Sequence, residues 1–412
     1  MKHLRNIHPI SWTIIIGTIF GRMATSMSIP FLAIYLIKVH HATPFETGLV
    51  IAISSLIGII VSFYGGYLSD RIGRKKMILL SIFGWSFVFL GFTFSQTILS
   101  FFLVNALNGL CRSLFEPASR ALLSDITQNE QKLLVFNLRY TAINLGVVFG
   151  PFIGLMLGSS QTTFPFMIAF IIYFLYGMVF IYQFHTYPKA FTQNNSAESI
   201  SMRNAFQMTK KDKVFLFIII GTIFCVFGYG QFTSTLPQYF SLLPDFENGT
   251  KFFSYMLSLN AVAVLILQYP IVHIAKKYSP INSLILGNLF ISVSLVSFSI
   301  TKNSLALIVI VIAFTIGEIL TFTMIDLFVD TIAKSELKGT YFGTLGFTQL
   351  GNVLAPIIGG FLLDHFGIKH PITIFSSLLV LTLLGIPFLV MAKWRLTFQK
   401  NNHTGSNVRV SH

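Results

Sequence analysis

Three ionisable side chains lie close together inside one apolar segment of this sequence. The run 98–123 carries Arg112, Glu116 and Arg120 at four-residue intervals. On a helix these three share roughly one face, and Glu116 can pair with either neighbour. A charge at the centre of a bilayer costs about 2.5 kcal/mol or more, so such residues are functional candidates by default. A structural ion pair is the alternative, above all for Arg120 near the end of the run.

A second acidic candidate lies in "FTIGEILTF" of the run 303–329, where Glu318 is flanked by apolar residues. A carboxyl group in hydrocarbon can be held neutral and can release its proton when water or an arginine reaches it. Glu318 is therefore the first candidate for a proton carrier, with a purely packing role as the alternative. Asp326 and Asp330 are expected to be gate residues at the end of the same span.

The composition places these charges in a membrane. The chain has 412 residues, of which 54% are hydrophobic and only 10% charged, and its mean hydropathy is +0.74. Soluble domains carry about 25% charged residues. Twelve apolar runs are long enough to cross a bilayer, at about 10–37, 45–68, 76–95, 98–123, 134–158, 164–184, 213–241, 252–275, 281–301, 303–329, 339–363 and 370–392.

The only long polar interval divides these runs six and six. We therefore predict an all-α membrane protein with an N-terminal six-helix bundle (1–184), a linker (185–212), a C-terminal six-helix bundle (213–392) and a tail (393–412). With the N-terminus inside, only Lys38, Lys251, Lys302 and Lys369 fall in outside loops. The positive-inside rule then places both termini in the cytoplasm of a multi-pass cell-membrane protein.

Several other classes of protein are disfavoured by the same residues. The net charge of +14 is spread in short clusters between spans, which indicates membrane topology and no nucleic-acid partner. Cys111 and Cys225 lie far apart in apolar runs, so neither a disulfide framework nor a cysteine metal site is expected. No phosphate-binding loop is present to power transport with a nucleotide, and no nucleophile motif indicates an enzyme.

Two short segments recur six spans apart. "LGVVFGPFIG" in the fifth run resembles "LGNVLAPIIGG" in the eleventh, and "GYLSDRIGRKK" after the second run has a weaker counterpart, "VHIAKKYSPIN", after the eighth. Two matches at the same offset favour a duplicated six-span unit, as transporters often have.

The loop "GGYLSDRIGRKK" carries a more specific signal. It matches every fixed position of G-x-L-x-D-R-x-G-R-K/R through Gly66, Leu68, Asp70, Arg71, Gly73, Arg74 and Lys75. On this motif the chain resembles a major facilitator superfamily transporter along essentially its whole length. The resemblance implies a cytoplasmic gating role for Gly66, Asp70, Arg71, Gly73 and Arg74, with Asp125 as their acidic partner. A basic loop that only sets orientation is the alternative.

The fifth run resembles the motif of the antiporter branch of this family through Gly146, Gly150, Pro151 and Gly154. Glycines four apart allow close helix packing, and the proline permits a bend. Ordinary small-residue packing would explain the glycines alone. In the fourth span the family usually has an arginine where this chain has Asn105, so Arg112 is a substitute candidate beside Glu116 for proton coupling.

Further polar groups within spans are candidates for a substrate cavity. Arg22 and Arg139 either line the cavity or satisfy an acid from a neighbouring helix, and with Arg112 they would favour an anionic substrate. Uncharged candidates are Asn144, Gln231, Thr235 and Gln238, with helix-to-helix hydrogen bonding as the alternative for each.

We therefore predict a proton-coupled antiporter that exports small amphipathic molecules by alternating access. It would use the proton gradient with no cofactor or metal, and the resemblance implies a functional monomer in the lipid bilayer. The alternatives are a specific exporter of an anionic metabolite and a proton-coupled nutrient symporter. A membrane enzyme or sensor is a third and weaker hypothesis.

Overall fold

The computed structural model describes residues 7–188, 212–243, 249–275, 277–301, 303–332 and 344–408. For some helical residues, among them 62–72, 326–327, 330–332 and 399–408, it describes the backbone alone. Most of the predicted linker therefore lies outside the described residues, and the predicted boundaries of the two halves stay predictions.

The described chain is helical and contains no strand within these ranges. Twelve helical segments are long and apolar enough to cross a membrane, which confirms the predicted all-α architecture. The first six are α2 (Pro9–His40), α3 (Pro44–Ile72), α4 (Arg74–Phe94), α5 (Ile98–Asp125), α6 (Asn129–Met156) and α7 (Phe164–Thr186).

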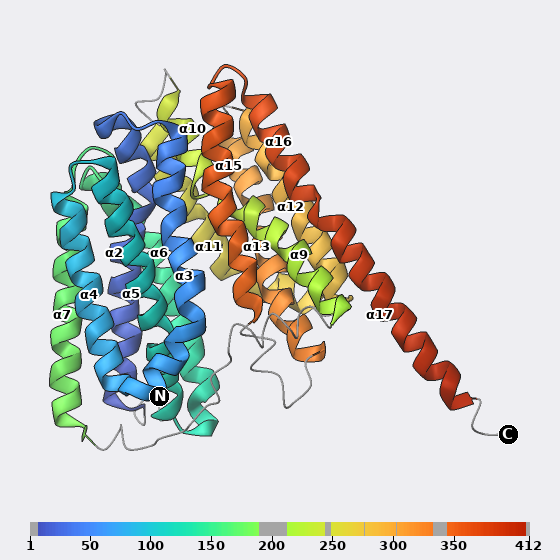
Figure 1. The fold of residues 1–412 in the computed structure, drawn as a ribbon, viewed down its shortest axis with the longest axis horizontal. Helices are drawn as coiled ribbons and strands as arrows, with labels where there is room; N and C mark the ends of the chain where they lie inside the picture. Colours follow the sequence, from blue (N-terminus) through green and yellow to red (C-terminus); the bar gives the residue numbers. More distant parts are fainter. Residues whose placement is uncertain are drawn as a thin grey trace. The chain divides into compact units, whose positions relative to one another are not determined.

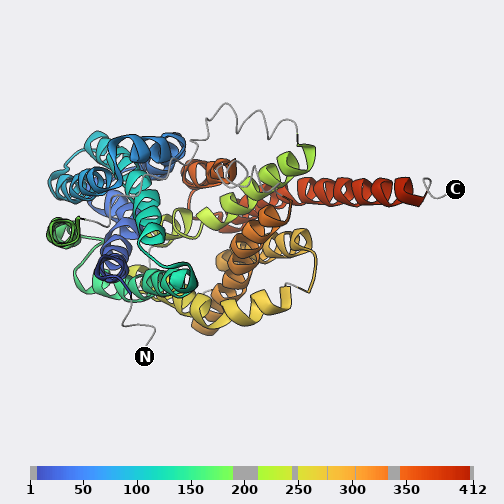
Figure 2. The same ribbon diagram turned by 90° about the horizontal axis from the view of Figure 1, so that it is seen from below.

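Of the remaining six spans, three are single helices: α11 (Gly249–Ala275), α12 (Pro280–Ile300) and α13 (Ser304–Ile332). The other three each consist of two segments: α9 (Lys213–Gly230) with α10 (Thr235–Leu242), the 3-10 turn η4 (Leu345–Gln349) with α15 (Leu350–Phe366), and α16 (Pro371–Leu383) with α17 (Gly385–Val408). The last helix continues well beyond the end of the predicted twelfth span, and Figures 1 and 2 show it as the long red helix α17.

By contacts, the chain forms two compact units. One comprises Met1–Ser199, Gln231–Ile266 and Val353–Lys369, and the other comprises Ile200–Gly230, Leu267–Asn352 and His370–His412. In the first unit α2 packs on α6 and α7, α3 on α5, and α4 on α5 and α7. These blue to green helices are seen side by side in Figure 1 and nearly end-on in Figure 2. In the second unit α12 contacts α13 and α16, and α9 contacts α17.

Local sequence sets the helix ends that hold this bundle. Thr97 and Ser100 form a reciprocal capping box at the start of α5. Gly73 begins α4 with φ 91°, a conformation that a residue with a Cβ rarely adopts, so the turn between α3 and α4 requires glycine there. At the start of α2, the Nδ1 atom of His8 accepts the Ile10 N–H at 3.2 Å.

The glycine row of α6 makes one of the close helix-to-helix approaches in the first unit. A Cβ on Gly146 would lie 2.6 Å from the Ile19 carbonyl oxygen and 2.7 Å from the Cβ of Arg22, and one on Gly154 would meet the Met27 carbonyl oxygen closer still. Across the same seam the Ser26 hydroxyl donates to the Gly146 carbonyl at 3.1 Å. The row therefore places α6 directly against the backbone of α2.

The duplicated segment in α15 packs in the same manner. Gly351, which corresponds to Gly146, faces the backbone of Ile223 and Phe227 in α9, and Gly359, which corresponds to Gly154, faces the side chains of Gln231 and Thr235. The fifth and eleventh spans thus pack on the first and seventh, as a duplicated unit requires.

We expect Gly146→Ala to destabilise the protein by about 1–3 kcal/mol, since the new methyl group meets backbone atoms that cannot move aside. Gly91→Ala is the matched control, because its Cβ would meet only the Val104 methyl groups at 3.3 Å. That variant should be neutral or slightly stabilised, since alanine favours the helix. Apparent melting temperatures in detergent measure both effects, and equal shifts in the two variants would contradict the predicted close approach.

The His8 cap predicts a pH dependence at the start of α2. Burial lowers the pKa of His8 below its ordinary value of 6.5, and a protonated Nδ1 cannot accept the Ile10 N–H. The cap's contribution is therefore complete above pH 6.5 and is lost as the pH falls through the lower folded-state pKa. His8→Asn, which keeps an acceptor but does not titrate, should lose less melting temperature between pH 7 and pH 5 than the parent. Identical pH profiles would rule out this role.

Candidate functional site

An ion cluster lies within the membrane-spanning part of the first unit. One carboxylate oxygen of Glu116 in α5 accepts from Arg22 Nη2 of α2, and the other accepts from Arg139 Nη2 of α6 at 2.5 Å. The sequence allowed Glu116 to pair with Arg112 or Arg120 at four-residue spacing, and the structure adds these two ion pairs from other helices. Arg120 instead donates from Nε to the backbone carbonyl of Glu116 at 3.3 Å.

The close approach of α2 and α6 brings the two arginines to one acid. Gly146 of α6 packs against the Cβ of Arg22. Because glycine has no side chain, α6 can approach α2 closely at Arg22. Arg22 and Arg139 therefore satisfy an acid from a neighbouring helix, which was one of the two alternatives that the sequence left open. A proton on Glu116 would remove the negative charge that both guanidinium groups neutralise, so protonation competes with the two ion pairs.

Accessibility rises across this cluster from one arginine to the other. The side chains of Arg139, Glu116 and Arg22 are 9%, 18% and 31% exposed. The Nε of Arg139 is buried and has no hydrogen-bond partner among the described residues. The cluster is therefore closed at Arg139 and open toward Arg22.

Arg112 adds a further positive charge beside the cluster. It interacts electrostatically with Arg22, Glu116 and Tyr173, and one of its guanidinium nitrogens lies 3.9 Å from where a Cβ would stand on Gly58 of α3. Among the described residues it makes no hydrogen bond or ion pair. Two guanidinium groups thus bind the carboxylate of Glu116, and that of Arg112 interacts with it through charge alone.

Asn105, the residue in place of the family's usual arginine, has a structural role here. It is 2% exposed, and its amide donates to the Val50 carbonyl of α3 at 2.6 Å. Its carbonyl accepts from Asn108, which in turn accepts from the Trp85 indole of α4 at 2.7 Å. This chain of hydrogen bonds joins α3, α4 and α5.

The predicted gating residues are partly described. Arg74, at the start of α4, forms an ion pair with Asp125, at the end of α5. The sequence had proposed Asp125 as the acidic partner of the basic motif, and the structure brings these two together. The side chains of Asp70 and Arg71 and the surroundings of Gly66 lie outside the described residues.

The second acidic candidate lies at the middle of a helix of the other unit. Glu318 is the central residue of the 29-residue helix α13 and is half-buried. Beside it, Gly317 packs against the Gly287 carbonyl of α12, which fixes α13 closely against α12. The side chains of Asp326 and Asp330 lie outside the described residues.

Three uncharged cavity candidates lie where the seventh span is interrupted. Gln231 lies in the turn between α9, which ends at Gly230, and α10, which begins at Thr235, whereas Thr235 and Gln238 belong to α10. All three are fully buried, and the Thr235 hydroxyl donates to the side-chain oxygen of Gln231. Neither polar side-chain atom of Gln238 has a partner among the described residues. In α6, Asn144 donates to the Tyr140 carbonyl of its own helix at 3.0 Å.

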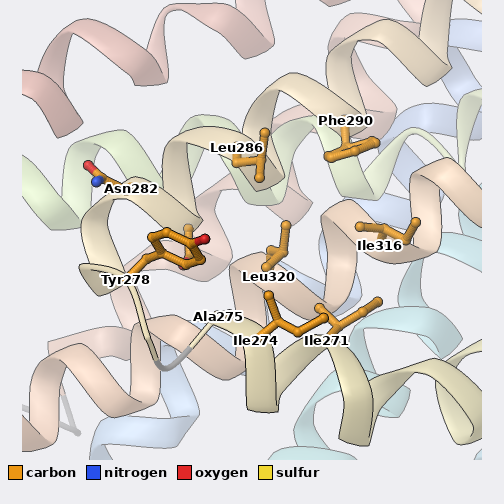
Figure 3. Close-up of a pocket in the computed structure, with 10 residues that line it drawn as sticks. Ile271, Ile274, Ala275, Tyr278, Asn282, Leu286, Phe290, Ile316 and Leu320 are labelled. Carbon is orange, nitrogen blue, oxygen red and sulfur yellow. The ribbon is translucent and has the colours of Figure 1, made fainter.

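An apolar cavity of about 320 Å³ lies between α11, α12 and α13 of the second unit. Figure 3 shows Leu286, Leu320 and Ile274 pointing into it, with Tyr278 and Asn282 at one end. Its lining is almost entirely hydrocarbon. It lacks the convergent polar groups that orient a ligand, so the ion cluster is the stronger site candidate.

The sequence analysis missed one polar contact in the first unit. The carboxylate of Asp364, in the last turn of α15, accepts the Phe45 N–H at the start of α3 at 3.0 Å. Gly360, one turn earlier, packs against the backbone of Pro44. An acid at the end of an apolar run is common, so no signal in the sequence singled out Asp364.

A bundle of twelve candidate spans with charged groups buried between them defines a multi-pass membrane transporter. Comparison with known families agrees, because the model of the Major Facilitator Superfamily matches residues 14–356. The chain belongs to this family of secondary transporters, and the resemblance noted from the sequence is confirmed.

Three relatives illustrate the range of the family around this chain. The MFS-type transporter YqjV of Bacillus subtilis is 56% identical over 98% of both chains. A Na(+), Li(+), K(+)/H(+) antiporter of Planococcus maritimus is 26% identical over 83% of this chain and 87% of the relative. The multidrug resistance protein MdtG of Escherichia coli is 24% identical over 90% and 92%.

Solved structures give the same fold. The crystal structure of the nucleoside transporter NupG superposes with a TM-score of 0.78 over 95% of this chain and 98% of that chain, at 13% identity. At that identity the likeness concerns the fold alone. The protein is thus a membrane-embedded secondary transporter, and its family implies a small-molecule substrate.

We expect Glu116 and Arg139 to be energetically coupled. Glu116→Gln alone leaves two guanidinium groups without their acid and should destabilise the protein by about 3 kcal/mol or more. Combining it with Arg139→Gln should cost less than the sum of the single changes, with a coupling energy of about 1–3 kcal/mol. Unfolding titrations in mixed detergent measure these free energies.

The control pair combines Glu116→Gln with Arg395→Gln, since Arg395 belongs to the second unit, where it lies on α17 over the Phe217 ring. That pair should be additive. If the unfolding free-energy changes of Glu116→Gln and Arg139→Gln were also additive, the ion pair between these two residues would be contradicted.

Proposed function

We propose that this transporter is a proton-coupled antiporter of the cell membrane, which exports small amphipathic molecules by alternating access. It works as a monomer with both termini in the cytoplasm and uses the proton gradient as its energy source. The observation that carries the proposal is Glu318, a carboxyl group at the centre of a membrane-spanning helix, where a charge is costly and has a functional purpose by default.

Antiport is supported by the fifth span. Its glycine row packs α6 against the backbone of α2, and Pro151 lies within α6, so the Val147 carbonyl lacks its usual helix donor. This pattern resembles the motif of the antiporter branch. The names of two relatives, an antiporter and a multidrug resistance protein, agree with that assignment.

The Arg74–Asp125 ion pair is proposed as part of the cytoplasmic gate. It joins the start of α4 to the end of α5 next to the basic motif, at the side where the positive-inside rule places the cytoplasm. An ion pair at a helix junction can stabilise one conformation and open in another, which is what a gate requires.

A second candidate function is favoured by the ion cluster. Three arginines beside one glutamate leave two positive charges uncompensated within the spans, which suits a specific exporter of an anionic metabolite or a proton-coupled symporter. A proton on Glu116 would release both of its arginines, so a proton and an anion would bind there together. The direction of proton movement separates this from antiport.

The protein reconstituted in liposomes with an internal pH dye tests both candidates. Under an imposed proton gradient, a panel of lipophilic cations, neutral amphiphiles and organic anions should include one that drives proton movement opposite to its own flux. Movement in the same direction would establish symport and overturn the proposed antiport.

We expect Glu318→Gln to reduce substrate-driven proton movement at least tenfold, because the amide cannot carry the proton. Glu46→Gln is the matched control, since Glu46 is exposed and its role is to accept the Thr43 N–H in a helix cap, which the amide oxygen also does. Its proton movement should equal that of the parent. Full proton coupling in a folded Glu318→Gln protein would remove Glu318 from this role.

A further inference from the structure

Arg112 is a charged group at membrane depth, and none of the described residues is its hydrogen-bond or ion-pair partner. It lies near the middle of the 28-residue helix α5, about 20 Å along the axis from either end. No hydrogen bond or ion pair joins it to any residue that the structure describes. A lone guanidinium group at this depth is costly unless water or a ligand reaches it.

Arg112 lies on the side of α5 opposite its exposed leucines, and the residue is itself exposed. On α5 the leucines at 99, 103 and 107 form an exposed apolar stripe. At about 100° per residue, Arg112 lies about 180° around the helix from Leu103. It lies almost directly below Asn105, whose amide contacts α3. The exposed surface of Arg112 therefore does not belong to the apolar stripe.

The arginines around Arg112 have N–H groups that are not used in hydrogen bonds among the described residues. The Nε of Arg139 is buried and has no partner among the described residues, and only 7% of the residue is exposed. Arg22 is the most exposed member of the ion pair triad and offers its remaining N–H groups. Glu116 is the one acid with which these three arginines interact, and both of its oxygens are occupied.

We infer that Arg112, with Arg22 beside it, forms the binding site for an anionic group of the transported molecule, a carboxylate or a phosphonate. A guanidinium group presents a planar fork of donors that matches such anions in two parallel hydrogen bonds. The Glu116 carboxylate competes with the bound anion for Arg22 and opposes it through its own charge. This assignment rests on the proposed function only in that the bound molecule is the cargo, and it requires neither antiport nor proton coupling.

Binding without any gradient tests the site. Four probes share one hexyl tail: heptanoate, hexylphosphonate, heptanamide and hexylammonium. Cys111 and Cys225 are free and buried, so a thiol-reactive dye reports unfolding of the purified full-length protein in detergent. The two anions should raise the melting temperature in a saturable manner, and the amide and the ammonium should not. Equal effects of all four probes, or stabilisation by the ammonium alone, would overturn the assignment.

Substitutions locate the effect at the cluster. Arg112→Gln should weaken the apparent affinity for hexylphosphonate about tenfold or more, as the loss of a charge-assisted hydrogen bond implies. Arg112→Lys, which keeps the charge without the fork, should lie between that variant and the parent. Arg395→Gln changes the net charge equally on α17 and should bind as the parent does. Parent-like anion affinity in Arg112→Gln would refute the site, and if that variant does not fold, the lysine variant decides.

Glu116→Gln gives a readout of opposite sign. Removing the competing carboxylate should raise the affinity for the anions, whereas a site for cations would lose affinity in the same variant. Weaker anion binding in folded Glu116→Gln would contradict the assignment. If proton coupling fails in liposomes while anion binding depends on Arg112, the proposed antiport is wrong and the anion site stands.

Discussion

The carboxylate of Glu116 is the interaction on which the centre of the first unit depends. It neutralises charge on Arg22 of α2 and Arg139 of α6, and it lies on α5, so one acid joins three helices. A charged side chain in hydrocarbon is not solvated by water. Leaving it unpaired costs more free energy than an ion pair contributes to stability. The positions of α2, α5 and α6 are therefore linked by the need to keep this carboxylate and its two guanidinium groups together.

Small residues make that arrangement possible. Gly146 packs against the Cβ of Arg22 and the backbone of Ile19, which brings α6 close enough to α2 for both arginines to reach the same acid. The glycine row thus has a second consequence besides helix packing. The same feature that resembles an antiporter motif also determines how the buried charges are shared, so packing and electrostatics in this unit are not independent.

The excess of positive charge indicates that the cluster binds a ligand as well as joining helices. A purely structural pair would need one arginine for one acid, and this site has three. The apolar cavity between α11, α12 and α13 shows the contrast, because it has room for a ligand but no charge to orient one. Recognition in a membrane transporter depends on a few polar groups in an apolar surrounding, and the cluster provides them.

The sequence by itself determined the twelve spans, the family and the residues that carry charge at membrane depth. Hydropathy, glycine spacing and motif positions are local properties of the chain, so the duplicated α6 and α15 segments and the Arg74–Asp125 partnership could be predicted. The tertiary structure alone decided which arginines Glu116 binds. Four-residue spacing places Arg112 and Arg120 within reach, but in a low-dielectric interior the acid pairs with whichever guanidinium groups the packing of helices brings nearest. That packing brings Arg22 to Glu116 across 94 positions of the chain, and among the described residues it gives Arg112 no ion pair, which no local pattern could reveal.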